Sequence, residues 1–257
     1  MASLISNPPI LIELLRRELS ERYQGSLLGW GWALIHPVAQ LAALSLVFTH
    51  LLPARPGGAL PYAAFLALGL WPWQLFANAV ARANGALTGN AALLGKVPIS
   101  PLLFVASRVL ASQLPDLLGF AAILAVLLAW LDGLDLIGLP LLLPALATLL
   151  LWSLAISILV AVVQVFARDT EHGTGQLLML GFFLSPVLYD RSLLPPSIAW
   201  PLALNPLAAP IETMRAALTG TSPPWPALAI SLLAAIAALY LALILYWRAR
   251  PHLEDFL

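Results

Sequence analysis

The stretch of the chain that decides the fold is LPLLLPALATLLLWSLAISILVAVVQVF, residues 139–166, which contains no charged side chain. A helix of about 20 apolar residues is long enough to cross the ~30 Å hydrocarbon core of a bilayer. We therefore predict that residues 139–166 form a transmembrane helix. Similar apolar runs recur on both sides of this stretch.

The composition of the whole chain supports the same class of protein. Of its 257 residues, 61% are hydrophobic and 9% are charged, whereas a soluble domain has about 25% charged residues. These values exclude a soluble enzyme, a disordered protein and a nucleic-acid-binding protein. The short alternating segments of a transmembrane barrel are missing, so we predict an all-α, polytopic membrane protein. The chain has no cysteine and therefore no disulfide and no thiolate metal site.

Six apolar runs predict six transmembrane helices in a single domain, residues 1–257. The fifth run has about 14 residues and ends at Ser185-Pro186, where a helix should break. Prolines interrupt the segment that follows, so residues 192–219 are predicted to form short re-entrant helices between spans five and six. A surface loop with interfacial helices is the alternative. The predicted spans are residues 33–52, 61–81, 102–131, 139–166, 176–189 and 227–247.

Residues 8–24, before the first span, have the pattern of an amphipathic helix. Leu11, Leu15 and Leu19 recur every four residues, and such a helix lies in the membrane interface rather than across the membrane. Two roles fit this pattern equally well. The helix is either a lever that also docks a partner protein or a plain topology anchor.

Basic residues set the predicted orientation of the chain. With the N-terminus in the cytoplasm, nine arginine and lysine side chains fall on or near the cytoplasmic side and three fall outside. Both termini are therefore predicted to be cytoplasmic. Residues 1–32 lack the apolar core of a cleaved signal peptide, so the first span is expected to act as an uncleaved anchor.

Motifs that carry chemistry are missing from the sequence. There is no G-x-x-x-x-G-K-[ST] loop for nucleotide phosphates, no H-E-x-x-H and no G-x-S-x-G. The four histidines are scattered, and no pattern predicts a metal site. We therefore expect no enzyme activity in this chain, and the missing motifs argue against an intramembrane enzyme. If the protein is a transporter, its energy must come from an ion gradient or from another chain.

Two features lie at membrane depth and are candidates for function. Asp116 follows Pro115, whose missing N–H leaves a carbonyl free at residue 111. Asp116 either has a transport role, bonds to another helix, or marks a span boundary that lies elsewhere than predicted. Trp71-Pro-Trp73 places two indoles in the middle of the second span. Aromatic faces stack on sugars as they do on nucleic-acid bases. The alternative is that both rings fill contacts between helices.

Charged residues in and near the re-entrant region form a second set of candidates. Glu212 and Arg215 are three residues apart on a helical stretch and can pair. Asp190 and Arg191 follow the short fifth run. The four residues are interpreted as a network that stabilises a gate, or as plain extracytoplasmic salt bridges.

At this point the ordered motifs resemble a known family. The chain is similar to the membrane subunit of ATP-binding-cassette exporters for cell-surface polysaccharides, a branch of the type-two exporter permeases. The segments that carry the resemblance span nearly the whole chain: residues 22–37 (RYQGSLLGWGWALIHP), 69–73 (GLWPW), 90–98, 165–169 (VFARD), 182–189 (FFLSPVLY) and 204–207 (LNPL), with Glu212 and Arg215.

The resemblance implies a homodimer in the bacterial inner membrane, paired with two copies of a separate ATPase that binds ATP and Mg²⁺. This chain would then hold no cofactor or metal and bind no nucleic acid. The substrate would be a polymer on a lipid carrier, such as the O-antigen of lipopolysaccharide, capsule or teichoic acid. The short helices between spans five and six would form the outer gate. The cytoplasmic loops, residues 83–100 and 167–175, would contact the ATPase.

The site residues implied in this way fall into three groups. The substrate path would be lined by Trp71, Trp73, Phe183, Tyr189 and Gln40. The gate region would contain Asp190, Arg191, Glu212 and Arg215. The loops that contact the ATPase would contribute Asn90, Lys96, Arg168, Asp169 and Glu171.

Three other functions stay open on the sequence. A type-two permease for drugs or lipids would share the architecture without a long polymer path. A gradient-driven carrier would work without an ATPase and would depend on Asp116. An intramembrane biosynthetic enzyme would turn over substrate as an isolated chain.

Overall fold

Four helices of the described chain are long and apolar enough to cross a membrane. The computed structural model describes residues 8–47, 60–94, 99–130, 134–191, 194–195, 197, 202 and 204–256. Within these residues every regular element is a helix. The candidate spans cover Tyr62–Ala83, Pro101–Ala129, Leu139–Phe166 and Trp225–His252. The prediction of an all-α, multi-pass membrane fold is confirmed, and four of the six predicted spans have such a helix.

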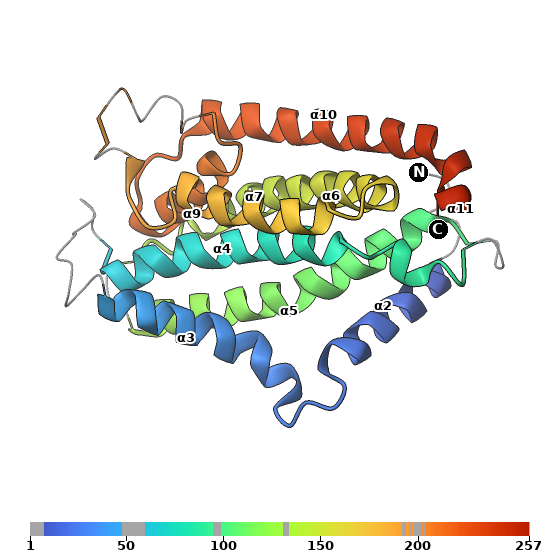
Figure 1. Cartoon of the computed structure of the whole chain (residues 1–257). Coiled ribbons are helices and arrows are strands. Elements are labelled where there is room, and N and C mark those ends of the chain that lie inside the picture. The colour runs from blue at the N-terminus through green and yellow to red at the C-terminus, as the bar shows by residue number, and fades with distance from the viewer. Residues whose placement is uncertain are drawn as a thin grey trace.

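The four long helices lie side by side (Figure 1). They are α4 (Tyr62–Ala83), α5 (Pro101–Trp130), α6 (Leu142–Phe166) and α10 (Trp225–Ala249). Helix α6 packs against both α10 and α4, and α4 also packs against α5. Prolines mark several of their starts, because a missing N–H costs nothing in the first turn of a helix: Pro101 opens α5, and Pro226 is the second residue of α10.

Two shorter helices form a V beside the bundle. Helix α2 (Pro8–Tyr23) packs on α5, and α3 (Trp32–Leu46) packs mainly on α4 (Figure 1). The predicted helix at residues 8–24 is therefore present. The predicted first span, residues 33–52, is described as a helix up to Leu46, and residues 48–52 lie outside the described chain. We call the end of the bundle where α2 begins and α11 (Leu253–Phe256) lies the base.

The fifth predicted span differs from its prediction at both ends. Residues 168–175 were expected to form a loop, yet α7 runs over Thr170–Leu184. Helix α6 ends because Ala167 adopts an extended conformation, and α7 restarts within three residues with Glu171 in its first turn. A carboxylate there complements the helix dipole. Helix α7 stops at Ser185 because the residue before Pro186 disfavours helical geometry, so residues 185–189 form a turn.

The main core lies between α4, α6 and α9 (Ala208–Thr219). Helix α9 falls within the predicted re-entrant segment and is buried along almost its whole length. Of the rest of that segment, residues 192–193, 196, 198–201 and 203 lie outside the described chain. The loop before α6 approaches α9 closely: Asp135 donates its N–H to the Leu218 carbonyl at 3.0 Å. At Gly138 an added Cβ would overlap the Ala217 carbonyl and lie 3.1 Å from its Cα.

This close approach predicts that Gly138→Ala destabilises the protein. The methyl group has to displace main-chain atoms of α9, and overpacking of this kind costs about 1–3 kcal/mol. Thermal unfolding of the purified protein in detergent should show a lower midpoint. Gly173→Ala is the matched control, because its Cβ meets nothing within 4 Å and alanine is favoured over glycine in a helix by up to about 1 kcal/mol. Equal midpoints for the two variants would contradict the prediction.

Candidate functional site

An apolar cavity of about 540 Å³ lies between α4, α6 and α7. Trp73 and Phe76 from α4 and Trp152 from α6 supply its aromatic wall, and Leu177 and Leu178 from α7 close another side. Trp73 makes an edge contact with Phe182, at 6.1 Å between ring centroids. An added Cβ on Gly181 would lie 2.8 Å from the Trp73 ring. Because Gly181 has no side chain, the Trp73 ring can pack directly against α7.

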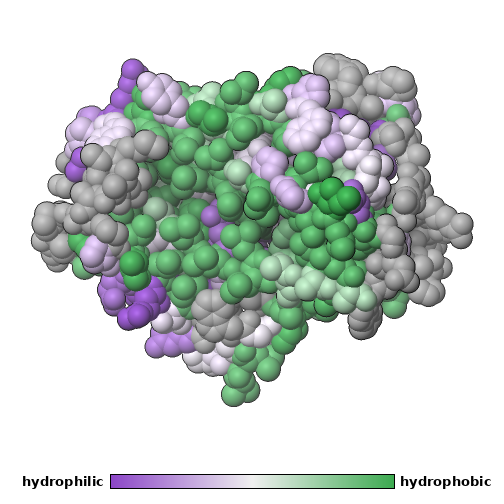
Figure 2. Space-filling model, turned by 180° about the vertical axis from the view of Figure 1, so that it is seen from behind, coloured by the Kyte–Doolittle hydropathy of each residue, from purple (hydrophilic) through white to green (hydrophobic). Residues whose placement is uncertain are grey.

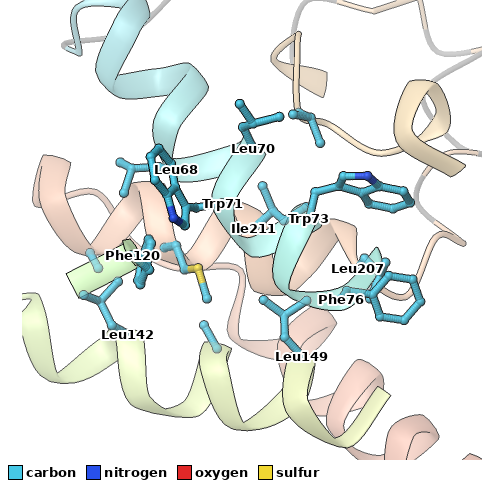
Figure 3. Close-up of a cluster of buried hydrophobic side chains, with 14 of the residues drawn as sticks. Leu68, Leu70, Trp71, Trp73, Phe76, Phe120, Leu142, Leu149, Leu207 and Ile211 are labelled. Atoms are coloured by element: carbon cyan, nitrogen blue, oxygen red, sulfur yellow. The ribbon is translucent and has the colours of Figure 1, made fainter. Parts of the chain in front are cut away.

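The two tryptophans of the predicted substrate path point to opposite sides of α4 (Figure 3). Trp73 lines the cavity. Trp71 is only 1% exposed and belongs to a buried cluster with Phe120 and Leu142. In this structure Trp71 fills a contact between helices and does not line the cavity. Residues 71 and 73 are two apart, about 200° around a helix, so they cannot share one face.

The other predicted path residues lie apart from this wall. Phe183 on α7 is 56% exposed and points away from the core. Tyr189, in the turn after α7, donates its hydroxyl to the Phe183 carbonyl at 3.3 Å. Gln40 on α3 accepts a hydrogen bond from the Gln74 side chain on α4. The structure therefore does not bring the five path residues into one site within a single chain.

Arg215 holds the turn after α7 against α4. Its guanidinium donates to the Pro186 carbonyl at 2.6 Å, to the Val187 carbonyl at 2.9 Å and to the Phe65 carbonyl at 3.2 and 3.3 Å. The same group stacks on the Phe65 ring, 3.5 Å from its centroid. Gly69 makes the space, because a Cβ there would lie 2.5 Å from Arg215 Nη2. The planar fork of donors suits this set of main-chain acceptors.

The predicted Glu212–Arg215 pair is not the pair that forms. Glu212 Oε2 lies 3.1 Å from Arg191 Nη2 instead. Arg215 points into the protein, where main-chain carbonyls satisfy it, whereas Glu212 faces the turn that carries Arg191. Burial raises the pKa of the Glu212 carboxyl, and Arg191 offsets part of this rise. Asp190 is half-buried and lies within electrostatic range of Arg215 and Glu212.

At the base, one buried carboxylate forms ion pairs with arginines from three helices. Glu18 on α2 is 2% exposed. Its oxygens lie 3.1 Å from Arg108 Nε on α5, 3.7 Å from Arg17 Nη2 and 4.0 Å from Arg82 Nη2 on α4. From the sequence, Glu18 is a partner for Arg22, four residues further along the same helix. That pattern considers one helix and therefore missed Arg108 and Arg82, which come from α5 and α4.

The residues expected to contact an ATPase fall into two environments. Asn90 is buried; it accepts a 2.6 Å hydrogen bond from Arg17 and donates one to the Ala86 carbonyl at 2.9 Å. Its side chain therefore faces α2 rather than the surface. Arg168, Asp169 and Glu171 are exposed at the start of α7. Lys96 lies outside the described residues.

A second, polar cavity of about 250 Å³ joins these segments at the base. Arg168 and Glu171 line it together with Thr88 from the first loop, Gln164 at the end of α6 and Phe256 of α11. The two loops expected to contact an ATPase, residues 83–100 and 167–175, thus meet in space. Within the described residues no group of three or more His, Cys, Asp or Glu side chains could hold a metal ion.

The Arg215 contacts predict that Arg215→Lys destabilises the fold. A lysine ammonium is compact and cannot reach all three carbonyls, and each buried acceptor left without a partner costs about 1–3 kcal/mol. The thermal midpoint of the purified protein should fall by several degrees. Arg16→Lys makes the same change at an exposed site on α2 and should leave the midpoint unchanged. An unaltered midpoint in Arg215→Lys would show that these contacts do not support the turn.

Comparison with known proteins identifies the family to which the chain belongs. The family of ABC-2 type transporters matches residues 11–219. The O-antigen export system permease protein RfbA of Myxococcus xanthus is 30% identical over 210 residues, 80% of this chain and 79% of that protein. RfbA of Klebsiella pneumoniae is 28% identical over 214 residues, 80% of this chain and 78% of that protein.

A third relative is named for a different polymer and matches a similar share of this chain. The polysialic acid transport protein KpsM of Escherichia coli is 26% identical over 207 residues, 80% of this chain and 79% of that protein. The family match covers well over half of the 257 residues and runs from within α2 to the end of α9. The chain therefore belongs to the family of ABC-2 type transporters, as a multi-pass membrane protein.

Proposed function

We propose that this chain is the permease subunit of an ATP-binding-cassette transporter that exports a cell-surface polysaccharide. The observation that carries the proposal is its likeness, over four fifths of its length, to permeases for O-antigen and for polysialic acid. Those relatives are named for different polymers, and both polymers are polysaccharides. We expect the polymer to be carried on a lipid. As a transport subunit, the chain itself performs no catalytic chemistry.

A separate ATPase would supply the energy, with ATP and Mg²⁺ bound to two copies of that subunit. The sequence has no phosphate-binding loop of its own. The cavity lined by Thr88, Arg168, Glu171 and Phe256 supports the base as the docking surface. There an ATPase would touch both cytoplasmic loops and the C-terminal helix at once, so its closure would move all three together.

A second copy of the chain would complete the transport path. Helix α7 has 15 residues, about 22 Å of helix, which is short for a ~30 Å hydrocarbon core. Leu177, Met179, Leu180 and Phe183 on α7 are each more than half exposed. In a homodimer, α7 and the exposed face of α3 would pack against the partner. Phe183, Tyr189 and Trp73 would then lie near the path between the two copies, where aromatic rings guide a sliding sugar chain.

The proposed placement puts the base in the cytoplasm of a bacterial inner membrane. Helices α2 and α11 lie at the same end of the bundle (Figure 1), which supports two cytoplasmic termini. Hydrophobic residues cover most of the middle of the face in Figure 2, and hydrophilic ones gather mainly toward its edges, as a membrane-embedded surface requires.

With α3 and α7 the chain would have six spans. Helix α9, with the Arg191–Glu212 pair, would form the re-entrant outer gate.

The proposed dimer can be tested by cysteine cross-linking, because the chain contains no cysteine of its own. Phe183→Cys should form an intermolecular cross-link in oxidised native membranes, since α7 would face its symmetry mate. Leu233→Cys is the control on α10: Leu233 is 67% exposed but would face lipid, so it should stay monomeric on a non-reducing gel. Cross-linking of Leu233→Cys alone would place the interface elsewhere.

The substrate class is tested by depletion of this protein in its host. Newly labelled polysaccharide should vanish from the cell surface and accumulate inside as lipid-linked polymer, because synthesis continues while export stops. The measurement is a pulse label followed by separation of surface and internal polymer, with expression of the intact chain as the control. Unchanged surface polymer would remove the polysaccharide assignment and leave drug or lipid efflux as the leading account.

A further inference from the structure

The N-terminal helix is attached to transmembrane helix α5 at the point where Pro115 interrupts the hydrogen bonding of α5. We propose that Arg22 is a positioning residue that fastens α2 to this interruption. As a result, α2 and the first half of α5 move as one body, and displacement of the base reaches the middle of the membrane. The geometry stands on its own, whereas the link to transport rests on the proposed function.

Arg22 occupies the gap that the proline creates. Proline has no N–H, so the carbonyl four residues earlier, at Ala111, loses its helical partner. Arg22 Nη1 lies 3.3 Å from the Ala111 oxygen and 3.3 Å from the Ser112 oxygen. Its Nη2 lies 3.8 Å from Asp116 Oδ1. One guanidinium from another helix therefore satisfies both the open backbone and the carboxylate beside it.

Asp116 connects the same point to a third helix. It is 7% exposed, and its Oδ2 accepts a 2.9 Å hydrogen bond from the Asn78 side chain on α4. Removing Arg22 would break its ion pair with this buried carboxylate, which would keep the Asn78 amide and the charge of Arg82 in its electrostatic range. Removing one partner of a buried ion pair is strongly destabilising. The contact is therefore expected to persist while the surrounding helices move.

Two further layers fix the register between α2 and α5. Leu14, Glu18 and Arg22 are spaced four residues apart and share one face of α2. They meet α5 in matching order. Leu14 packs with Leu103 and Phe104, Glu18 pairs with Arg108, and Arg22 reaches residues 111–116. An apolar layer and two charged layers resist sliding of one helix along the other.

The same helix also contacts the first cytoplasmic loop. Arg17 Nη2 lies 2.6 Å from Asn90 Oδ1, in the short turn Thr88–Asn90. Helix α2 thus makes polar contacts at three points: Arg17 with the loop proposed to touch the ATPase, Glu18 with Arg108, and Arg22 with the Pro115 site. A helix bends most easily where a proline removes a hydrogen bond. Movement of α2 would therefore act on α5 where it is most easily bent.

A double-mutant cycle on the purified full chain tests the contact without any substrate. Arg22→Met should lower the thermal midpoint, and Pro115→Ala should reduce that loss, because residue 115 can then donate to the Ala111 carbonyl. Such non-additivity is the signature of residues that share a partner, here the Ala111 carbonyl. Arg16→Met, the same change at an exposed site on α2, should have no effect. An identical loss from Arg22→Met with proline or alanine at 115 would overturn the assignment.

The transport role is tested in the assembled transporter with its ATPase. Arg22→Met should lower export about tenfold, the size expected for one hydrogen bond to a charged group in a rate-setting step, while ATP hydrolysis per complex is retained. Arg22→Lys should recover part of the export. A fall of export and hydrolysis in the same proportion would show a merely structural role and overturn the proposal.

A disulfide between Leu14→Cys and Phe104→Cys keeps the proposal testable should Arg22→Met fail to fold. Both residues belong to one packed cluster, and the chain has no other cysteine. If α2 and α5 move as one body, the oxidised and reduced forms export equally well. Loss of export on oxidation would mean that α2 slides along α5 and would overturn the proposal. If the substrate assignment fails instead, intact transporter shows no polysaccharide export, while the thermal cycle still reports on the contact.

Discussion

The constraint on which the rest of the structure depends is that hydrocarbon offers no hydrogen-bond partner to the protein backbone. At two of the prolines that interrupt or end helices, Pro115 within α5 and Pro186 after α7, an arginine from a distant element supplies the donors. Arg22 reaches the Ala111 and Ser112 carbonyls before Pro115, and Arg215 reaches the carbonyls of Pro186 and Val187. Arginine suits this task because its donors are several, planar and permanently charged. At these two sites the main chain is interrupted while the nearby carbonyls still have donors.

Arginine contacts hold the helices together at the base and at the turn after α7, whereas α7 itself is lightly packed. At the base, Glu18 and its arginines tie α2, α4 and α5 together. Arg215 ties the turn after α7 to α4, through the space left by Gly69. Between them α7 has only one buried side chain, Thr174, and borders the apolar cavity. Because local stability follows buried contacts, a lightly packed helix held only at its end is expected to move more easily than the rest of the bundle.

Sequence reasoning succeeded where the signal was local and failed where partners came from far along the chain. The apolar length of residues 139–166 sufficed for a span, and the proline at 115 sufficed for a free carbonyl at 111. The predicted start of the fifth span was wrong because the polar run of residues 168–175 suggested a loop, whereas the turn at Ala167 allows a helix to restart at Thr170. The Glu212 partner was also wrong: the i,i+3 rule considers one helix, whereas Arg191 and the carbonyls that bind Arg215 come from other segments.

By itself, the sequence determined the membrane class, the four long helices and the helical N-terminal segment, and it lacks a G-x-x-x-x-G-K-[ST] motif. These depend on hydropathy, periodicity and motif spacing along one stretch of chain. Only the tertiary structure decided that Trp71 and Trp73 serve opposite sides of α4, that Asn90 faces α2, and that Arg22 fills the gap at Pro115. The physical reason is that a buried polar or aromatic group is defined by what surrounds it in space, and residues 22 and 115 meet only when α2 packs on α5.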